Sequence, residues 1–347
     1  MIVDDSTVAR AVLSRMIGTD PSFEIAAVAG TAEAAVEALD HCQVDVVILD
    51  LEMPGAGGLK SIPRIIAAGA GAKVLVVSSQ AEDGAEQTVA ALALGAADTL
   101  PKPGIGRFNG RFSEVLLAKL RALGHAPMAP QARAVEQRQG TSILLRPMPD
   151  TPIDILAIGA STGGIHALNT LFAKLPPVIG VPILITQHLP AAFMPVFARQ
   201  IGNAARREAL VGEDGMALRS DRIIVAPGDA HLAIEPDGCG GALVRLSHAP
   251  VLSGCRPSVD PMLSSVGGVY GPRAMGIMLT GMGRDGCEGA SRLVGCGGTM
   301  ITQDEASSAV WGMPRAVFEA GLASAILPPE KIARRIAARC EELAPCR

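Results

Sequence analysis

Short apolar runs alternate with segments of helical periodicity along most of the chain, beginning at its first residue. In the first third, apolar runs bounded by turn residues predict strands at Met1–Val3, Phe23–Val28, Val44–Leu49, Lys73–Val77 and Asp98–Leu100. Apolar residues at helical spacing predict helices at Thr7–Ile17, Thr31–Leu39, Leu59–Ala68, Ala85–Leu94 and Phe112–Leu123. Strands and helices that alternate in this way predict a doubly wound α/β domain over residues 1–123.

The alternation stops between residues 124 and 151. This segment repeats Pro, Gly, Ala, Gln and Arg, for example in Ala126-Pro127-Met128-Ala129-Pro130-Gln131, and its apolar residues have no regular period. Such a composition is typical of an interdomain linker.

A second alternating region, residues 152–347, follows this linker. It opens with an apolar run that begins at Asp154. Further strands are predicted at Val181–Thr186, Arg222–Ala226, Leu243–Leu246, Ala274–Thr280, Met300–Thr302 and Ala325–Leu327. Helical spacing is present in Ile165–Phe172, Phe193–Ile201 and Met262–Tyr270. The pattern predicts a second doubly wound, mainly parallel sheet, so the expected fold class is α/β with two such domains.

Composition narrows the class of protein. The 347 residues are 49% hydrophobic and 18% charged, which is typical of globular domains. A net charge of −4 and 3% aromatic residues give no reason to expect nucleic acid as a partner. No apolar run approaches the roughly 18 residues that span a bilayer, and the acidic N-terminus is unlike a signal peptide. The seven cysteines form no C-x-x-C pair, so we expect no zinc site and a reducing, cytoplasmic location.

Polar residues with related chemistry follow the predicted strands of the first domain. Asp4 and Asp5 follow the first strand, Asp50 follows the third, Ser78 ends the fourth and Lys102 lies just beyond the fifth. Carboxyl ends of parallel strands meet at one edge of the sheet. Three carboxylates gathered there repel one another unless a cation such as Mg²⁺ lies among them. A lysine and a hydroxyl nearby can hold the oxygens of a phosphoryl group on one carboxylate.

In the second domain, the apolar run at Asp154 ends in the small residues Gly159-Ala160-Ser161-Thr162-Gly163-Gly164 before a predicted helix. A tight strand-to-helix turn of this kind can raise a serine hydroxyl above the sheet edge. The same residues are also typical of a plain helix cap or a phosphate-binding turn, and the turn alone does not separate these readings.

Three predicted strands of this domain end in Ser161, His188 and Asp285. If these strands are neighbours, a hydroxyl, an imidazole and a carboxylate share one crevice, which is the arrangement for nucleophilic acyl transfer. Ser161 would attack a carbonyl, His188 would take its proton, and Asp285 would orient the imidazole. Backbone N–H groups near Thr162 or Met282 could then bind the oxyanion.

The polar residues at the strand ends of the first domain lie in segments that resemble motifs of the response-regulator receiver family. The resembling segments are Val3-Asp4-Asp5-Ser6, Leu49-Asp50-Leu51-Glu52-Met53-Pro54, Val77-Ser78-Ser79 and Pro101-Lys102-Pro103. The resemblance implies a flavodoxin-like receiver in which Asp50 accepts a phosphoryl group. It also implies that Asp4, Asp5 and Asp50 hold Mg²⁺, and that Ser78 and Lys102 are the switch hydroxyl and the phosphoryl-sensing lysine.

Two features depart from the receiver pattern. Only three residues precede Asp4, whereas receivers usually have a longer first strand. Thr99 lies three residues before Lys102, where many receivers carry an aromatic residue, and this argues against an aromatic switch.

Residues 152 to about 340 resemble the catalytic domain of chemotaxis-type protein-glutamate methylesterases, with a Rossmann-like fold. The matching segments are Gly159–Gly164, Thr186-Gln187-His188-Leu189-Pro190, Ala226-Pro227-Gly228-Asp229, Arg256-Pro257-Ser258-Val259-Asp260, Leu279–Gly286 and Gly312-Met313-Pro314. Ser161, His188 and Asp285 match the family's catalytic residues, and Thr162 and Met282 match residues lining its site. Cys255 is a departure, because the family often has histidine there.

Together the resemblances imply a phosphorylation-regulated serine hydrolase that serves chemosensory adaptation. It would release methanol from glutamate methyl esters on methyl-accepting chemoreceptors and deamidate receptor glutamines. The expected phosphodonor is a chemotaxis histidine kinase, and no nucleic acid or direct membrane insertion is expected. We expect Mg²⁺ at the receiver, no cofactor for hydrolysis, and an unphosphorylated receiver that blocks the Ser161 crevice.

Other classes of function explain less of the sequence. A dinucleotide-dependent oxidoreductase would need G-x-G-x-x-G spacing, which the turn at Gly159–Gly164 lacks. A non-catalytic signalling adaptor would explain the receiver but not Ser161, His188 and Asp285 together. A receiver-controlled serine hydrolase that acts on another ester or amide stays open.

Overall fold

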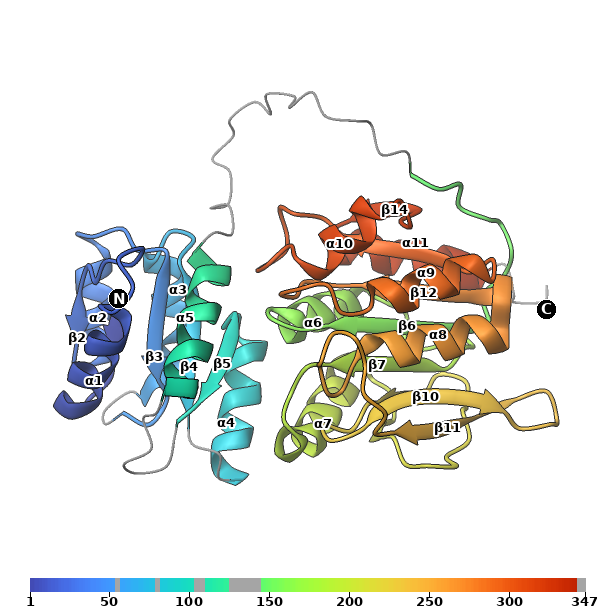
Figure 1. Cartoon of the computed structure of the whole chain (residues 1–347), viewed down its shortest axis with the longest axis horizontal. Coiled ribbons are helices and arrows are strands. Elements are labelled where there is room, and N and C mark those ends of the chain that lie inside the picture. The colour runs from blue at the N-terminus through green and yellow to red at the C-terminus, as the bar shows by residue number, and fades with distance from the viewer. Residues whose placement is uncertain (54–56, 79–81, 103–109, 125–144, 342–347) are drawn as a thin grey trace. The chain divides into compact units, whose positions relative to one another are not determined.

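The computed structural model describes residues 1–53, 57–78, 82–102, 110–124 and 145–341 (Figure 1). The chain divides into two compact units, residues 1–132 and residues 133–347. The division falls inside the segment predicted as a linker, residues 124–151, most of which lies outside the described residues. In these described ranges, no helix is both long and apolar enough to cross a bilayer.

The first unit is a parallel sheet with helices on both faces. Its strands are β1 (Ile2–Val3), β2 (Val28–Ala29), β3 (Val46–Asp50), β4 (Lys73–Ser78) and β5 (Asp98–Pro101). Its helices are α1 (Thr7–Ile17), α2 (Ala32–Leu39), α3 (Gly57–Ala68), α4 (Glu82–Ala93) and α5 (Gly110–Gly124). The strand order is β2-β1-β3-β4-β5. Helices α1 and α5 pack together, and α3 packs against both α2 and α4, as the doubly wound prediction requires.

The second strand of this unit is shorter than predicted. The prediction placed a strand at Phe23–Val28, but β2 covers only Val28–Ala29. Its neighbour β1 contributes only Ile2 and Val3 to the pairing, so the residues before Val28 have little backbone to pair with. They line a cavity of about 550 Å³ instead.

The second unit is also a doubly wound sheet, and Figure 1 shows its helices on both sides of the strands. Its strands are β6 (Ile155–Ala160), β7 (Ile183–Gln187), β8 (Ala209–Val211), β9 (Ile223–Val225), β10 (His231–Pro236), β11 (Ala242–Ser247), β12 (Ala274–Met278), β13 (Thr299–Gln303) and β14 (Ala325–Leu327). Its helices are α6 (Gly164–Lys174), α7 (Met194–Ala205), α8 (Val259–Tyr270), α9 (Cys287–Gly295), α10 (Met313–Glu319) and α11 (Pro329–Glu341), with short 3₁₀ turns at Ala191–Phe193 and Gly271–Arg273.

The main sheet of this unit has the order β14-β13-β12-β6-β7-β9-β8, and its pairs are parallel. Helix α6 contacts α7 and α11 on one side, and α8 contacts α9 on the other. The predicted strand at Leu243–Leu246 does not belong to this sheet. It lies in β11, which forms an antiparallel hairpin with β10 and packs through β10 against α8. The hairpin is closed by the turn residues Asp237–Gly241, which allow the chain to reverse directly.

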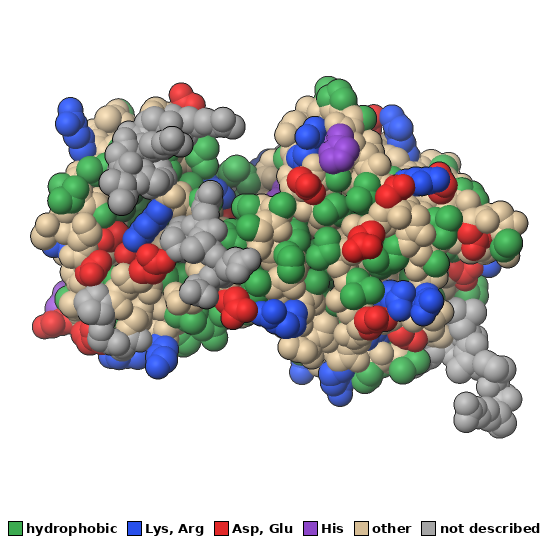
Figure 2. Space-filling model, turned by 90° about the horizontal axis from the view of Figure 1, so that it is seen from below, with side chains coloured by type: hydrophobic (Ala, Val, Ile, Leu, Met, Phe, Trp, Pro, Cys, Tyr) green, Lys and Arg blue, Asp and Glu red, His purple; other side chains and the backbone are tan. Residues whose placement is uncertain are grey.

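The central strands of the second unit are apolar on both faces because helices cover both. Every residue of β6 and β12 is buried, and α8 shares one apolar cluster with both strands. On the described part of the face seen in Figure 2, acidic and basic side chains are interspersed over this unit. This mixture of signs agrees with the small net charge of −4.

Candidate active site

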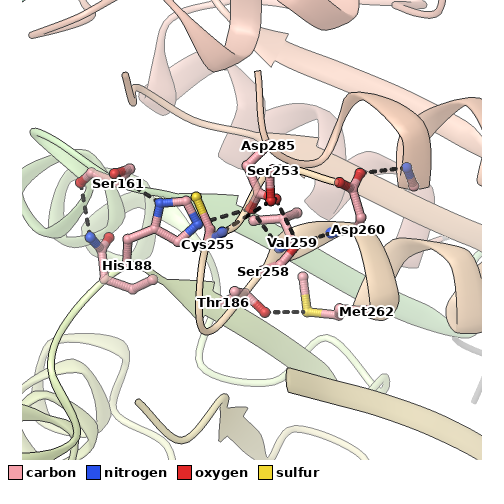
Figure 3. A network of polar contacts seen from close by, with 12 residues as sticks. Ser161, Thr186, His188, Ser253, Cys255, Ser258, Val259, Asp260, Met262 and Asp285 are labelled. Carbon is pink, nitrogen blue, oxygen red and sulfur yellow. Dashed lines mark hydrogen bonds and ion pairs between the residues drawn. The ribbon is translucent and has the colours of Figure 1, made fainter. Parts of the chain in front are cut away.

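Ser161, His188 and Asp285 follow three neighbouring strands of the second sheet. Strand β6 lies between β12 and β7, and all three run parallel, so their carboxyl ends meet at one edge. Ser161 Oγ lies 3.1 Å from His188 Nδ1, and His188 Nε2 lies 2.9 Å from Asp285 Oδ2. Figure 3 shows the imidazole between the hydroxyl and the carboxylate. The adjacency on which the predicted arrangement depended is therefore present.

A glycine turn positions Ser161 at the end of β6. The Ser161 N–H donates to the carbonyl of Thr280 at 3.0 Å, which ties the turn to the loop after β12. Gly163 then adopts a left-handed φ of 77°, which favours glycine, and α6 begins at the next residue. The N-cap of α6 is Gly163, and no side chain caps this helix. The hydroxyl of Ser161 contacts His188 instead, so the side chain of Ser161 does not cap α6.

The Asp285 carboxylate accepts four hydrogen bonds. Its Oδ1 accepts from the hydroxyls of Ser253 and Ser258, both at 2.6 Å. Its Oδ2 accepts from the Val259 N–H at 2.7 Å and from His188. Burial by itself would raise the pKa of Asp285, but the bonds from His188, Ser253 and Ser258 outweigh it and lower the pKa to about 2. The carboxylate is therefore ionised at neutral pH.

The ionised carboxylate fixes the proton on the imidazole. Because Asp285 can only accept, His188 Nε2 carries the N–H and Nδ1 presents its lone pair to the Ser161 hydroxyl. The two ring nitrogens are exchanged relative to the chymotrypsin-type triad, where Nε2 faces the serine. Both nitrogens of an imidazole can take or give a proton, so the exchanged ring supports the same base chemistry.

The loop after β12 packs closely against the nucleophile. The Thr280 hydroxyl donates to the carbonyl of Thr162 at 2.9 Å, which holds the turn that carries Ser161. A Cβ added at Gly281 would lie 2.8 Å from the Cβ of Ser161 and 2.4 Å from Met313 Sδ. These two distances leave no room for a side chain at residue 281 unless its neighbours move.

The two predicted oxyanion residues lie next to Ser161 in the chain or next to Gly281, which lies close to Ser161. Thr162 is buried directly after the serine, whereas Met282 follows Gly281 and is 41% exposed. A cavity of about 650 Å³ lies at the opposite, amino ends of β6 and β7, where Ile153 and Val181 line it. That cavity is therefore separate from the site.

The first unit gathers its predicted residues at the corresponding edge. Asp4 follows β1 and Asp50 ends β3, and these strands pair in register. Lys102 Nζ lies 2.6 Å from Asp50 Oδ2 and 4.0 Å from Asp4 Oδ2. Both carboxylates are buried, whereas Asp5 is exposed. The backbone of Ser78 ends β4, but its side chain lies outside what the structure describes.

The carboxylates of this edge fit a divalent cation. One oxygen from each of Asp4, Asp5 and Asp50 lies within 4.8 Å of the others. Burial raises the pKa of Asp4, and the nearby negative charge of Asp50 raises it further. A bound Mg²⁺ would offset this repulsion, and oxygen ligands are what Mg²⁺ prefers.

Comparison with known proteins assigns both units. A family model described as CheB methylesterase matches residues 156–336, and one described as response regulator receiver domain matches residues 1–107. The chain belongs to the CheB methylesterase family. The protein-glutamate methylesterase/protein-glutamine glutaminase 1 of Paramagnetospirillum magneticum is 40% identical over 360 residues, which cover 96% of this chain and 93% of the relative.

Two further relatives agree with this CheB methylesterase assignment. The protein-glutamate methylesterase/protein-glutamine glutaminase 2 of Caulobacter vibrioides is 40% identical over 348 residues, covering 99% of each chain. The crystal structure of the Thermotoga maritima CheB methylesterase catalytic domain has 32% identity and a TM-score of 0.52, covering 55% of this chain and 99% of that chain.

In this CheB methylesterase chain, several residues that support Asp285 were not predicted from the sequence. Ser253 and Ser258 both hold Asp285. The Ser258 N–H donates to Nδ1 of the buried His231 at 3.0 Å, and His231 Nε2 bonds the Ala249 carbonyl at 3.0 Å. Burial lowers the pKa of His231, which favours the neutral ring that these two bonds require. Ser258 belongs to a motif quoted above without a role, whereas Ser253 carries no signal in the sequence.

Cys255 lies on the same loop and is half-buried beside the triad. Burial and the negative charge of Asp285 raise the pKa of its thiol. Since the thiolate is the reactive form, Cys255 does not compete with Ser161 as nucleophile at neutral pH.

Proposed function

We propose that this chain is a phosphorylation-regulated serine hydrolase for chemosensory adaptation. Its substrates would be glutamate methyl esters on methyl-accepting chemoreceptors, which release methanol, and receptor glutamines, which release ammonia. The contact of Ser161 with His188, and of His188 with Asp285, is the observation that carries the proposal. The printed names of the relatives suggest the substrate class.

In the first step, Ser161 Oγ attacks the ester carbonyl carbon while its proton moves to His188 Nδ1. The imidazolium that forms is stabilised by the Asp285 carboxylate at Nε2. The tetrahedral intermediate collapses when methanol leaves with the proton from Nδ1, and the glutamyl group stays on Ser161 as an ester.

In the second step, water attacks the acyl-serine and gives its proton to Nδ1. Collapse of this intermediate returns the proton to Ser161 Oγ and frees the glutamate carboxylate. The backbone N–H groups of Thr162 and Met282 are the proposed oxyanion donors, because both residues flank the nucleophile. A glutamine substrate follows the same path with ammonia as the leaving group, and neither path needs a cofactor.

Regulation would begin with phosphoryl transfer from a histidine kinase to Asp50. Asp4, Asp5 and Asp50 would hold Mg²⁺, which supplies charge neutralisation for phosphoryl transfer when bound. Lys102 already contacts Asp50 and can hold an oxygen of the phosphoryl group. We propose that the unphosphorylated receiver blocks the Ser161 crevice and that phosphorylation lifts this block.

Exposed apolar side chains beside the triad fit a protein substrate. Met282, which follows Gly281 in the loop that approaches Ser161, is 41% exposed. Leu252, which precedes Ser253, is 94% exposed. Isolated exposed side chains are common, but both of these adjoin residues of the site. They give a receptor helix two apolar contacts that a small ester does not use.

A fluorophosphonate probe tests the nucleophile, because it reacts with a serine whose proton is removed by a neighbouring base. We expect one adduct on Ser161 by peptide mass spectrometry. His188→Gln should slow labelling by ~10²-fold or more, since the serine loses its base. The matched control His166→Gln alters an exposed histidine of α6 and should leave the rate unchanged.

Labelling at another serine, or equal rates in the two histidine variants, would contradict the assignment of Ser161. Labelling at Ser161 without methanol release from any methylated receptor would favour the receiver-controlled hydrolase of another ester or amide.

A further inference from the structure

The thiol of Cys255, which the proposed hydrolase reaction does not use, forms a cluster with His188 and Asp285. One ligand atom each from Cys255, His188 and Asp285 lies within 4.8 Å of the other two. Figure 3 shows the sulfur beside the imidazole, on the loop that also carries Ser253 and Ser258. Three residues from three separate segments therefore bring sulfur, nitrogen and oxygen donors together.

We propose that Cys255, His188 and Asp285 bind a zinc-like divalent cation, Zn²⁺ or Cd²⁺, and that this ion inhibits the enzyme. Thiolate, imidazole and carboxylate are the ligands that Zn²⁺ takes in tetrahedral sites. The spacing of cysteines could not reveal this site, because its ligands are far apart in the sequence.

The cluster is partly prepared for an ion. Ser253, Ser258 and the Val259 N–H hold the Asp285 carboxylate in place, and such supporting bonds orient metal ligands. Asp285 is buried, whereas the His188 side chain is 18% exposed and Cys255 is also partly exposed. An ion can therefore enter from solvent on the side of the imidazole and the thiol, and a water molecule can complete its coordination.

Binding at this cluster would block catalysis through the imidazole. The ion takes the lone pair of His188 Nε2, so the single proton of the neutral ring moves, through solvent, from Nε2 to Nδ1. There it faces the Ser161 hydroxyl. A protonated Nδ1 is a donor and cannot accept the serine proton, so acylation stops. The thiol proton of Cys255 is also released when its sulfur binds the ion.

Metal binding can be measured without catalysis. In the full chain carrying Ser161→Ala, Cd²⁺ should produce the ultraviolet charge-transfer band of a cadmium–thiolate bond. Adding Cys255→Ser should remove the high-affinity part of this band. The matched control is Cys287→Ser, which alters another half-buried cysteine outside the cluster and should retain it. Equal titrations of the two serine variants would overturn the site.

Inhibition is measured on the chain with Ser161 intact, as the fraction of each variant's own metal-free activity toward a small ester. Zn²⁺ should inhibit the parent chain and the Cys287→Ser variant, and a chelator should restore both. Cys255→Ser should need at least ~10-fold more Zn²⁺ for half-inhibition. Inhibition that is equal in both variants, or binding without inhibition, would overturn the inhibitory role.

The inhibitory role rests on the proposed hydrolase function, whereas the cadmium titration does not. If no variant hydrolyses an ester but the Cys255-dependent band is present, the hydrolase proposal fails and the metal site stands. The fluorescence of Trp311, the single tryptophan, verifies that each variant is folded.

Discussion

At the residue scale, the charge of Asp285 depends on the groups that donate to it. Hydroxyls of Ser253 and Ser258 and the backbone N–H of Val259 replace the water that burial removes. They keep the carboxylate ionised, and this in turn fixes His188 in the tautomer whose lone pair faces Ser161. The orientation of the His188 imidazole is thus an electrostatic consequence of three donors that act through Asp285.

The lowered pKa of Asp285 makes the free energy of unfolding depend on pH over a defined range. Its folded pKa of about 2 lies below the ordinary value of 3.8, so the ionised form stabilises the folded state. This contribution, about 2 kcal/mol, is complete well above pH 4 and is lost as the pH falls through about 2. In Asp285→Asn it is absent at every pH.

We therefore expect the free energy of unfolding to be higher for the parent chain than for Asp285→Asn. This difference should be larger at about pH 6 than at about pH 3. Urea titration followed by Trp311 fluorescence reports this difference for the second unit, which contains the single tryptophan. A stability difference that does not change with pH would mean that the carboxylate is not selectively ionised in the folded state.

The residues of the proposed triad could be identified from the sequence, but some residues that support them could not. Ser161, His188 and Asp285 each follow an apolar run, so their place at strand ends is visible in the pattern. Ser253 lies in an irregular loop, and its contact with Asp285 depends on where that loop folds. Loops carry no periodic signal, so contacts of this kind appear only in the structure.

At the element scale, the order of strands decides whether a site exists. The sequence predicts β6, β7 and β12 but not that β6 lies between the other two, because strand order depends on how the crossover helices pack. Pairing partners also explain two departures from the predicted sheets. The strand at Phe23–Val28 is limited by the two residues of β1. Leu243–Leu246 is a strand, as predicted, but it pairs locally with β10 instead of joining the main sheet.

The close approach between the loop after β12 and the turn after β6 gives a test at this scale. Gly281→Ala would place a Cβ 2.8 Å from Ser161 Cβ, so the turn that carries the nucleophile must shift. We expect the hydrolysis rate to fall by about 10²-fold, the effect of a displacement near 1 Å. Gly268→Ala in α8, where an added Cβ meets open space, should leave the rate unchanged. Equal hydrolysis rates in the two variants would show that the loop after β12 moves and that the turn with Ser161 stays in place.

At the scale of the whole molecule, two sheets present polar residues at the carboxyl ends of their strands and divide the chemistry between them. In the first unit, Lys102 contacts Asp50. In the second unit, Ser161 contacts His188, which in turn contacts Asp285. The order of both units along the chain matches that of the family models. The proposed function makes Asp50 of the first unit the phosphoryl acceptor and Ser161 of the second unit the nucleophile, and it requires that the first unit control the second.

Methanol release from methylated receptor membranes tests this account most directly. It compares the unmodified chain with Ser161→Ala and Asp50→Ala, each with and without a small-molecule phosphodonor and Mg²⁺. We predict that Ser161→Ala lowers release by ~10³-fold or more, and that the phosphodonor stimulates only chains that retain Asp50. Release that persists without Ser161, stimulation that persists without Asp50, or no release from any form would contradict the account.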